Sequence, residues 1–315
     1  MRVLVAGGSG VIGRKLLPLL TSVGHDVVVI ARSGKRVVRL ESTGAKIVIA
    51  DALDRDAVLR AVDEAGPDAI VNMLTAIPSE LNPRRLAKEF EQTNLLRTVG
   101  TRNLIEAGER SGVRQVISQG LAYAYEPDGS GLANEDTSFW TRPPKQFVPV
   151  LAALKELEQR TQAASGLVLR FGHLYGPGSI YASDGSFVQQ VKAGKVPLVG
   201  GGTSTFSFTH AHDAATAIVA ALDKTVSGAL NIVDDDPVRM SVWLPVLADI
   251  LGAKAPKGAP AAIAKLAVGG WGVAYMTRLR GADNARAKLA LDWRPRHASW
   301  RDGFAAELKG KAVAA

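Results

Sequence analysis

Side chains that can exchange protons or contact a substrate lie at the end of, or after, two apolar segments, "VISQG" (116–120) and "GLVLRF" (166–171). They are Ser118, Gln119, Tyr123, Tyr125, His173, Tyr175 and Tyr181. A phenol or an imidazole can donate a proton, and an imidazole titrates near neutral pH. If both segments are parallel strands, their carboxyl ends share one edge of a sheet, where ligands of α/β proteins bind. The spacing therefore predicts a pocket there; packing or turn closure is the alternative role of each side chain.

A second group of residues has the chemistry to hold a diphosphate. "VAGGSGVIG" (5–13) follows an apolar run and opens a helical segment, with Gly7, Gly10 and Gly13 in the spacing G-x-x-G-x-x-G. The first glycine permits a tight turn, the second a close approach of backbone N–H groups, and the third close packing of helix on strand. The helix N-terminus, which includes Val11 and Ile12, favours an anion. This placement predicts a dinucleotide site.

The residues after the second apolar run indicate which dinucleotide is bound. An acidic residue there would accept from a ribose 2′-hydroxyl, but this chain has Arg32, Ser33 and Arg36. An arginine donates two charge-assisted hydrogen bonds to a phosphate. We therefore expect NADP(H) rather than NAD(H); a solvated basic loop is the alternative interpretation.

Further cofactor contacts are expected after the third and fourth apolar runs. Asp51 and Ala52 follow the third, and the Asp51 carboxylate could accept from the adenine amino group or cap the next helix. Leu74 and Thr75 follow the fourth and are expected to line the same site.

The elements that must position these residues are strands and helices in alternation. Continuous apolar runs suit parallel strands that are covered on both faces. They are "RVLVAG" (2–7), "DVVVIA" (26–31), "AKIVIA" (45–50), "DAIVNM" (68–73), "RQVIS" (114–118) and "GLVLRF" (166–171). We predict an α/β protein with a Rossmann-type doubly wound parallel sheet in residues 1–172 and a smaller C-terminal substrate lobe in 173–315. Residues 205–235 are expected to return to the sheet.

Composition excludes several classes of function. The 315 residues contain no cysteine, and the net charge of +8 comes from scattered basic residues without interleaved aromatics or zinc spacing, so we expect no nucleic-acid partner. "APAAIAKLAVGGWGVAYM" (259–276) is too short and too interrupted to span a bilayer, so no membrane partner is expected. The first strand begins at Arg2 without a signal segment, which favours a cytoplasmic protein.

Together these motifs resemble the extended short-chain dehydrogenase/reductase superfamily, in its NAD-dependent epimerase/dehydratase branch. The resemblance covers nearly the whole chain and rests on "GGSGVIG", "DAIVNMLTA", "GTRNLIEAG", "RFGHLYGPG", "HAHDAATAIVAAL" and "LNIVDDDP". It implies a nicotinamide cofactor, a substrate lobe and, since relatives are often dimers through a helical face, a homodimer. It also implies a Tyr-x-x-x-Lys helix, in which the tyrosine donates the proton and the lysine lowers its pKa.

That catalytic pattern is broken in "FVPVLAALKELEQRTQ" (147–162). If Lys155 is the lysine of the pattern, the tyrosine position holds Leu151. If Glu158 matches the usual downstream glutamate, the two positions hold Val150 and Leu154 instead. Neither alignment contains a tyrosine.

The resemblance also assigns roles near the strand ends. It sets Gln119, with Ser118 just before it, at the position of the Ser or Thr that orients the substrate oxygen. An amide can donate a hydrogen bond there but cannot act as an acid near neutral pH. It sets Arg97 in place of a structural asparagine. Lys155, Tyr123, Tyr125 and His173 remain as candidate catalytic residues, with Ser118, Tyr175 and Tyr181 as substrate contacts.

His210, His212 and Asp213 have the residue types of a metal site. The resemblance makes them a helix N-terminus instead, with Asp213 as cap or ion-pair partner, and nothing else in the sequence supplies further ligands at metal spacing. We therefore expect no metal.

The sequence supports two hypotheses about function. The first is an NADP(H)-dependent oxidoreductase or epimerase with a non-standard site, which acts on a small carbonyl or hydroxyl compound. The second is a non-catalytic NADP(H)-binding sensor or regulator, which the missing tyrosine favours and the substrate lobe opposes. Isomerisation or elimination with a retained cofactor is a third option.

Overall fold

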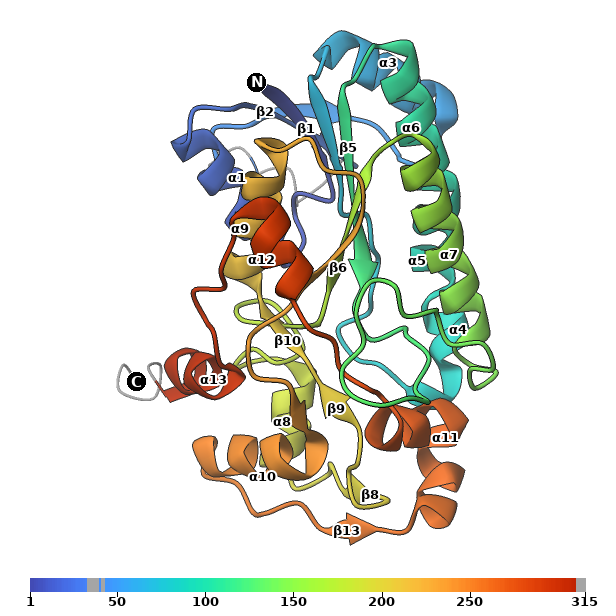
Figure 1. Ribbon diagram of the computed structural model, residues 1–315, viewed down its shortest axis with the longest axis vertical. Helices are drawn as coiled ribbons and strands as arrows, with labels where there is room; N and C mark the ends of the chain where they lie inside the picture. Colours follow the sequence, from blue (N-terminus) through green and yellow to red (C-terminus); the bar gives the residue numbers. More distant parts are fainter. Residues whose placement is uncertain (33–39, 41–42, 310–315) are drawn as a thin grey trace.

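A seven-stranded parallel sheet forms the centre of the computed structural model, which describes residues 1–32, 40 and 43–309 (Figure 1). Its strands are β1 (Arg2–Ala6), β2 (Asp26–Ala31), β3 (Lys46–Ile49), β4 (Ala69–Asn72), β5 (Gln115–Leu121), β6 (Leu167–Phe171) and β11 (Gly228–Ile232). The order is β11-β6-β5-β4-β1-β2-β3, and every neighbouring pair is parallel. The order reverses between β1 and β4, where α/β proteins bind dinucleotides. The predicted Rossmann-type doubly wound sheet is confirmed.

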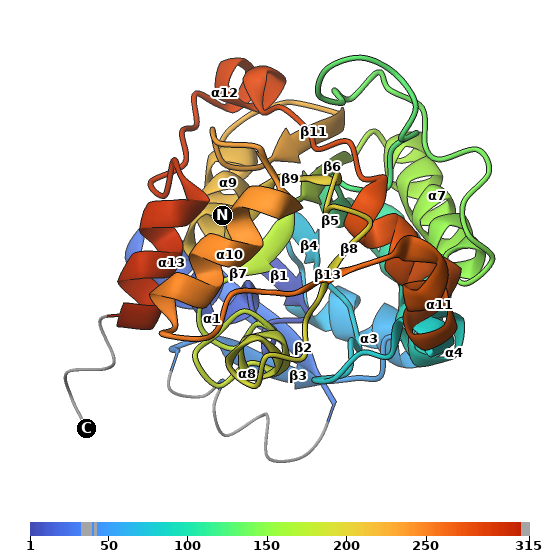
Figure 2. The ribbon, with the colours of Figure 1, turned by 90° about the horizontal axis from the view of Figure 1, so that it is seen from below.

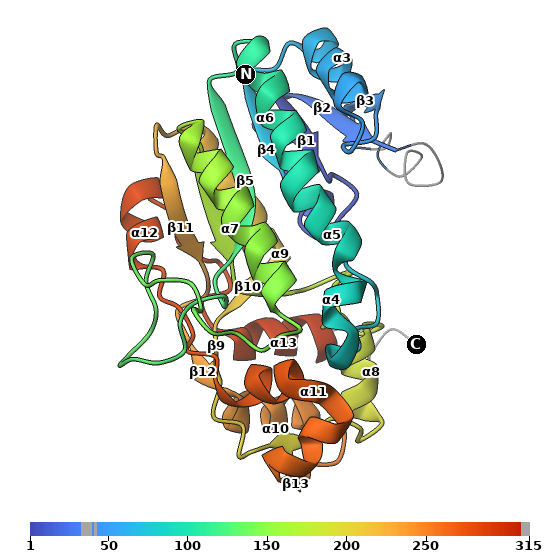
Figure 3. The same cartoon turned by 90° about the vertical axis from the view of Figure 1, so that its right-hand side faces the viewer.

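Helices cover both faces of the sheet, which explains why its inner strands are continuously apolar. One face carries α1 (Gly13–Ser22), α9 (Ala211–Leu222) and α12 (Ala285–Leu291). The other carries α3 (Arg55–Ala65), α5 (Glu91–Leu95), the π turn η2 (Leu96–Gly100), α6 (Thr101–Arg110) and α7 (Val148–Ala163). Figure 3 shows α5 continuing into α6 beside α7. Because β11 pairs with β6 and α9 packs on α1, part of the second half of the chain belongs to this layer.

The remaining elements form a lobe beyond the carboxyl ends of the strands, seen from below in Figure 2. Its helices are η1 (Pro83–Arg85), α4 (Leu86–Glu89), α8 (Ser186–Lys192), α10 (Met240–Ile250), α11 (Ala261–Thr277) and α13 (Trp300–Lys309). Its short strands are β7 (His173–Tyr175), β8 (Leu198–Val199), β9 (Thr205–Phe206), β10 (Phe208–His210), β12 (Val238–Arg239) and β13 (Gly258–Ala259). An aromatic core holds the lobe together, built from Trp140, Phe206, Phe208, Trp243, Trp271, Trp300 and Phe304.

The apolar stretch near the C-terminus forms α11, which packs against η1 and β8. The helix is kinked at Gly269, where φ is 70° and only glycine is unstrained. Trp271 is buried after the kink, whereas Ile263 and Leu266 before it are exposed. Within the described part of the chain, no helix has the length and apolarity needed to cross a membrane.

Candidate active site

The glycine turn has the backbone geometry of a phosphate cradle. Gly7 has φ of +94°, and a Cβ there would lie 2.5 Å from the carbonyl oxygen of Met73. The N–H of Gly10 donates to the Gly7 carbonyl at 3.0 Å, and a Cβ on Gly13 would collide with the carbonyl of Gly8. No side chain caps α1, so its first N–H groups can bind an anion. The turn therefore fits a pyrophosphate.

The basic segment begins where β2 ends. Arg32 directly follows β2 and is exposed, so its guanidinium can reach a ligand laid across the strand ends. Ser33 and Arg36 lie outside the described residues, so their part in the cofactor site stays a prediction.

Asp51 is not a helix cap. Its carboxylate accepts from the N–H of Leu53 at 3.0 Å, whereas the cap of α3 is Asp54, which accepts from the N–H of Ala57 at 3.0 Å. The capping interpretation of Asp51 is thus wrong, because α3 begins three residues later than it requires. Asp51 is exposed and Ala52 is buried beside it, and their contact with adenine stays a prediction.

Leu74 and Thr75 lie next to the glycine turn, because Gly7 faces the backbone of Met73 and Leu74. The N–H of Leu74 donates to the Asn72 side chain at 3.2 Å. Leu74 and Thr75 are both half-buried, so each keeps surface that a cofactor could cover.

The inward face of α7 is aliphatic at the two positions where the catalytic pair was expected. Val150 and Leu154 are buried, and so is Glu158, which pairs with Arg170 at 2.6 Å. Lys155 is exposed on the opposite side. The structure therefore favours the alignment that contains Val150 and Leu154. The prediction of a catalytic Lys155 is corrected, because its helical position points away from the sheet.

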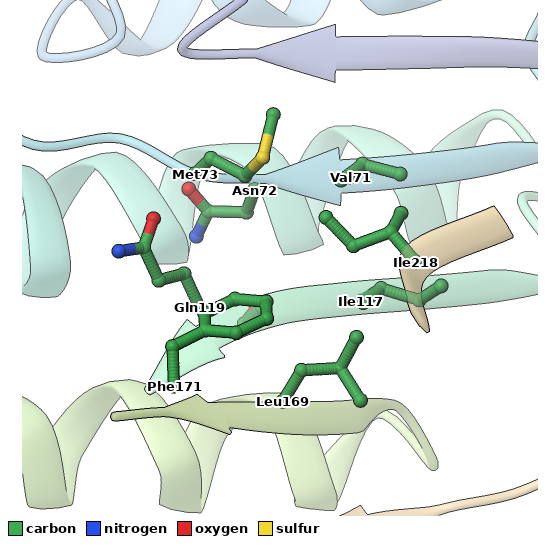
Figure 4. A pocket seen from close by; sticks show the side chains of 9 residues that line it. Val71, Asn72, Met73, Ile117, Gln119, Leu169, Phe171 and Ile218 are labelled. Carbon is green, nitrogen blue, oxygen red and sulfur yellow. The ribbon is translucent and has the colours of Figure 1, made fainter. Parts of the chain in front are cut away.

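Near the end of β5, the neighbouring side chains of Ser118 and Gln119 point to opposite faces of the sheet. Figure 4 shows Gln119 at the end of β5, near Asn72 of β4 and Phe171 of β6. Gln119 is half-buried there, as a residue that orients a substrate would be. Ser118 points to the other face, where it is buried and accepts from the Thr161 hydroxyl at 2.8 Å. The predicted substrate contact of Ser118 is therefore wrong, since successive strand residues face opposite sides.

His173 and Tyr123 stack with 4.4 Å between ring centroids. His173 Nδ1 lies 3.2 Å from the carbonyl of Ser207, and Nε2 is buried without a partner among the described residues. Burial lowers the pKa of His173 to about 3, so the ring is neutral near pH 7. Burial, which the sequence did not reveal, therefore opposes proton donation by His173 near neutrality, and any other part of His173 in catalysis stays a prediction.

Two further tyrosines and one arginine surround the stack of Tyr123 and His173. The hydroxyls of Tyr181 and Tyr275 lie 3.2 Å apart, and Tyr123 is close enough to interact electrostatically with both. Arg97 is 2% exposed and its charge acts on Tyr123. We call Arg97, Tyr123, His173, Tyr181 and Tyr275 the aromatic cluster. His173 and Tyr181 are buried in this cluster, whereas Tyr123 and Tyr275 are half-buried.

Sequence reasoning missed Tyr275 and did not assign Arg97 to the site. Tyr275 comes from α11 and meets Tyr181 only because the lobe folds back, so no local signal marks it. Arg97 lies four residues from both Thr93 and Thr101, which are fully buried, but that burial is visible only in the structure. The polar residue types gave no sequence signal of a buried helix face.

Two predicted site residues are structural. The Tyr125 hydroxyl donates to Asn231 Oδ1 at 2.5 Å and accepts from Arg170 Nη1 at 2.8 Å. Tyr175 is fully buried against Phe304 and the rest of the lobe's core. The catalytic prediction for Tyr125 and the substrate prediction for Tyr175 are therefore wrong, because the chain turns after β5 and β7 leads into the core.

Comparison with known proteins assigns the family. Residues 3–233 match the model of the NAD dependent epimerase/dehydratase family. The chain belongs to this family. It is 42% identical over 315 residues to a 3-diazoavenalumate denitrifying reductase of a Streptomyces species, covering 98% of this chain and 100% of that one. It is 26% identical to a 2-alkyl-3-oxoalkanoate reductase of Stenotrophomonas maltophilia, covering 73% and 67%.

Solved structures agree on the fold of this epimerase/dehydratase family member. UDP-glucose 4-epimerase of Thermotoga maritima, bound to UDP-glucose, has a TM-score of 0.79 at 21% identity, with 99% of this chain and 100% of that one covered. The UDP-glucose 4-epimerase of Thermus thermophilus in complex with NAD has a TM-score of 0.73 at 21% identity, with full coverage of both. The protein thus stands among the oxidoreductases and epimerases of its family, and its glycine turn fits the dinucleotide that the family description names.

The histidines at the start of α9 pack against the C-terminal segment that carries His297. Asp213 lies in the first turn of α9, as predicted for a helix N-terminus, and accepts from the N–H groups of Arg296 and His297 at 3.0 Å each. His210 caps the helix by accepting from the N–H of His212 at 3.2 Å, and its ring lies tilted against that of His297, with 3.7 Å between the centroids. One atom each of His210, Asp213 and His297 lie within 4.8 Å of one another. Protein donors and acceptors already engage these groups.

Proposed function

We propose that this protein is an NADP(H)-dependent reductase that transfers hydride to the ring carbon bearing the diazonium group of an aromatic acid, with release of dinitrogen. One observation carries the proposal: the inward position at which the family's proton-donating tyrosine would stand holds the aliphatic Val150. The 42% identical relative, a 3-diazoavenalumate denitrifying reductase, supports it across the whole chain.

The two possible substrate classes differ in their need for an acid. A carbonyl that accepts hydride becomes an alkoxide and needs a proton, and a positioned acid is worth about 10²–10⁴ in rate, or roughly 3–5 kcal/mol. When hydride reaches a diazonium carbon, a C–H bond forms and the C–N bond breaks. The C–N electron pair leaves with dinitrogen, and no proton is taken up. A site without the family's tyrosine is therefore suited to diazo reduction.

Residues along the strand ends would each have a separate role in binding the cofactor or the substrate. The glycine turn at Gly7 binds the pyrophosphate, and Arg32 binds the 2′-phosphate. A bound nicotinamide would supply the hydride. Gln119 orients the polar end of the substrate, and the half-buried ring of Tyr123, which stacks on the buried His173, contacts its aromatic plane.

Deuterium transfer tests this function directly. We would incubate the protein with NADPH deuterated at C4 of the nicotinamide and with 4-carboxybenzenediazonium, using heat-denatured protein as control. We expect NADPH oxidation at 340 nm, dinitrogen release and benzoate with one deuterium in the para position. Oxidation no faster than in the control, or benzoate without deuterium, would contradict hydride transfer to the diazo carbon.

A second candidate is reduction of a small carbonyl compound, as first expected from the sequence. It is favoured by Tyr123, whose phenol lies near the charge of Arg97 and could replace the missing tyrosine. Turnover of 3-oxo acids with NADPH, without turnover of the diazonium, would favour this candidate. NADPH binding without consumption of either class would favour the non-catalytic sensor.

A further inference from the structure

We propose that Arg97 binds an anionic oxygen of the aromatic substrate, a carboxylate or a phenolate. This site deepens the proposed function and rests on it for the aromatic character of the ligand. The proposal rests on the burial of Arg97, on its place in the helix and on the residues around it.

Arg97 is buried without a counter-charge among the described residues. Its side chain is 2% exposed, and Nη1 has no hydrogen-bond partner there. Burial lowers the pKa of the guanidinium to about 10, so it still carries its charge at neutral pH. A buried charge is costly unless it is paired. Such a group is expected to meet an anion when the site is filled.

A second buried arginine shows what a purely structural role requires. Arg170 donates to both carboxylate oxygens of Glu158 and to the Tyr125 hydroxyl, at 2.6–2.9 Å. Its pairing raises its pKa, whereas that of Arg97 is lowered. The fold therefore supplies a carboxylate for one buried guanidinium and, in the described chain, none for the other.

Arg97 lies in an irregular turn of its helix. It stands in the π turn η2, which interrupts the helix from Glu91 to Arg110. A π turn adds one residue to the helix and is frequent at functional sites. This turn packs against α7, whose inward residues Val150 and Leu154 are aliphatic. Arg97 therefore supplies a cation from an element packed against α7, the helix on which the family's pattern has its lysine.

The surroundings of Arg97 favour a flat ligand. Its guanidinium carbon is 6.0 Å from the centre of the Phe90 ring. The phenol of Tyr123 lies within reach of its charge, and the Tyr123 ring stacks on His173. Another buried polar atom one turn earlier, Asn94 Oδ1, also lacks a partner among the described residues. A ring bearing an acidic oxygen would satisfy the cation and lie against aromatic surface.

Binding of unreactive analogues tests the site without turnover. We would measure dissociation constants on the full chain saturated with NADP⁺, using two pairs of probes: benzoate against benzamide, and 4-nitrophenolate against 4-nitroanisole. The first pair reports a carboxylate site and the second a phenolate site. We expect Arg97→Met to weaken at least one anion by about tenfold or more, and its neutral partner less than twofold.

Two further variants keep the result interpretable. Arg102→Met removes an exposed arginine from the same helix and is expected to leave all four constants unchanged. Arg97→Lys keeps the charge and is expected to retain most of the anion preference, even if Arg97→Met does not fold. We also expect the melting temperature of Arg97→Met to equal or exceed that of the unaltered protein, because an unpaired buried charge is removed.

Three results would overturn the proposal. The first is no preference of the unaltered protein for either anion. The second is that Arg97→Met weakens the anion and its neutral partner equally in both pairs, and the third is that Arg97→Lys loses the preference while neutral binding is unchanged. These outcomes are separate from the proposed reaction. Anion preference without dinitrogen release would refute the reaction alone, whereas dinitrogen release without anion preference would refute the Arg97 site alone.

Discussion

Tyr123→Phe separates the two candidate reactions, because it removes one hydroxyl and little else. The Tyr123 ring stacks on His173 at 4.4 Å with 20° between the planes, and phenylalanine keeps that contact. We therefore expect the variant to fold with unchanged affinity for NADPH, so that any loss of kcat reports on the hydroxyl.

The size of the loss depends on what the hydroxyl does. If it protonates an alkoxide, its removal costs about 10²–10⁴ in kcat. If the substrate is a diazo compound, the hydroxyl contributes at most one hydrogen bond. Such a bond is worth about 0.5–1.5 kcal/mol, or up to about tenfold. We expect the smaller effect.

The pH profile gives a second reading of the same site. Burial raises the pKa of the Tyr123 phenol above its ordinary value and lowers that of His173 to about 3. Tyr123 therefore keeps its proton and His173 stays unprotonated around neutral pH. Both groups are neutral between pH 5 and pH 9, so we expect kcat for diazo reduction to be flat across that range.

The assay is steady-state NADPH oxidation at 340 nm with the diazonium probe, next to a fluorescence titration with NADPH. Tyr175→Phe is the matched control, because Tyr175 is buried in the lobe's core and its hydroxyl has no partner among the described residues. A loss of 100-fold or more in Tyr123→Phe, with Tyr175→Phe unaffected, would refute the acid-free reaction and support proton donation by Tyr123.

Three further substitutions test the cofactor site and the buried ion pair. Gly7→Ala is expected to weaken NADPH binding by at least about tenfold in a fluorescence titration, because alanine is strained at φ of +94° and its Cβ would meet a carbonyl 2.5 Å away; unchanged affinity would mean that the turn does not hold the cofactor. Arg32→Ala is expected to remove a preference for NADPH over NADH; an unchanged ratio of the two dissociation constants would exclude Arg32 from 2′-phosphate binding. Glu158→Gln is expected to lower the free energy of unfolding by about 3–5 kcal/mol, since it leaves Arg170 buried and unpaired; urea denaturation measures this. The control Glu156→Gln breaks only a partly exposed pair and should cost at most about 1 kcal/mol.

Local sequence was sufficient to predict the sheet and the phosphate cradle. Each strand is one continuous apolar run, because helices cover both faces, so strand positions follow from composition alone. The glycine spacing is equally local, and the constraint at Gly13 arises from the backbone of Gly8, five residues earlier. The close contact of Gly7 with Met73 depends on a distant segment, but the motif is readable without it.

The fate of the polar side chains beyond β5 depended on distant segments instead. Tyr123 and Tyr125 are two residues apart, yet one joins the aromatic cluster and the other binds Arg170. The strand ends at Leu121 and the chain turns, so alternation no longer assigns their faces. Tyr275 reaches Tyr181 across 94 residues of chain. Neither arrangement is encoded in a local pattern.

The missing tyrosine of α7 and the unpaired Arg97 together change which chemistry the site can support. On the inward face of α7, Val150 and Leu154 stand where the family's pattern has an acid, the tyrosine, and a cation, the lysine. Arg97 supplies a cation from the adjacent π turn, and the acid whose charge acts on it is Tyr123, a phenol whose pKa burial raises. A site that keeps positive charge and gives up its activated proton donor binds an anion better than it protonates an alkoxide. That balance favours an acidic aromatic substrate whose leaving group, dinitrogen, departs without a proton.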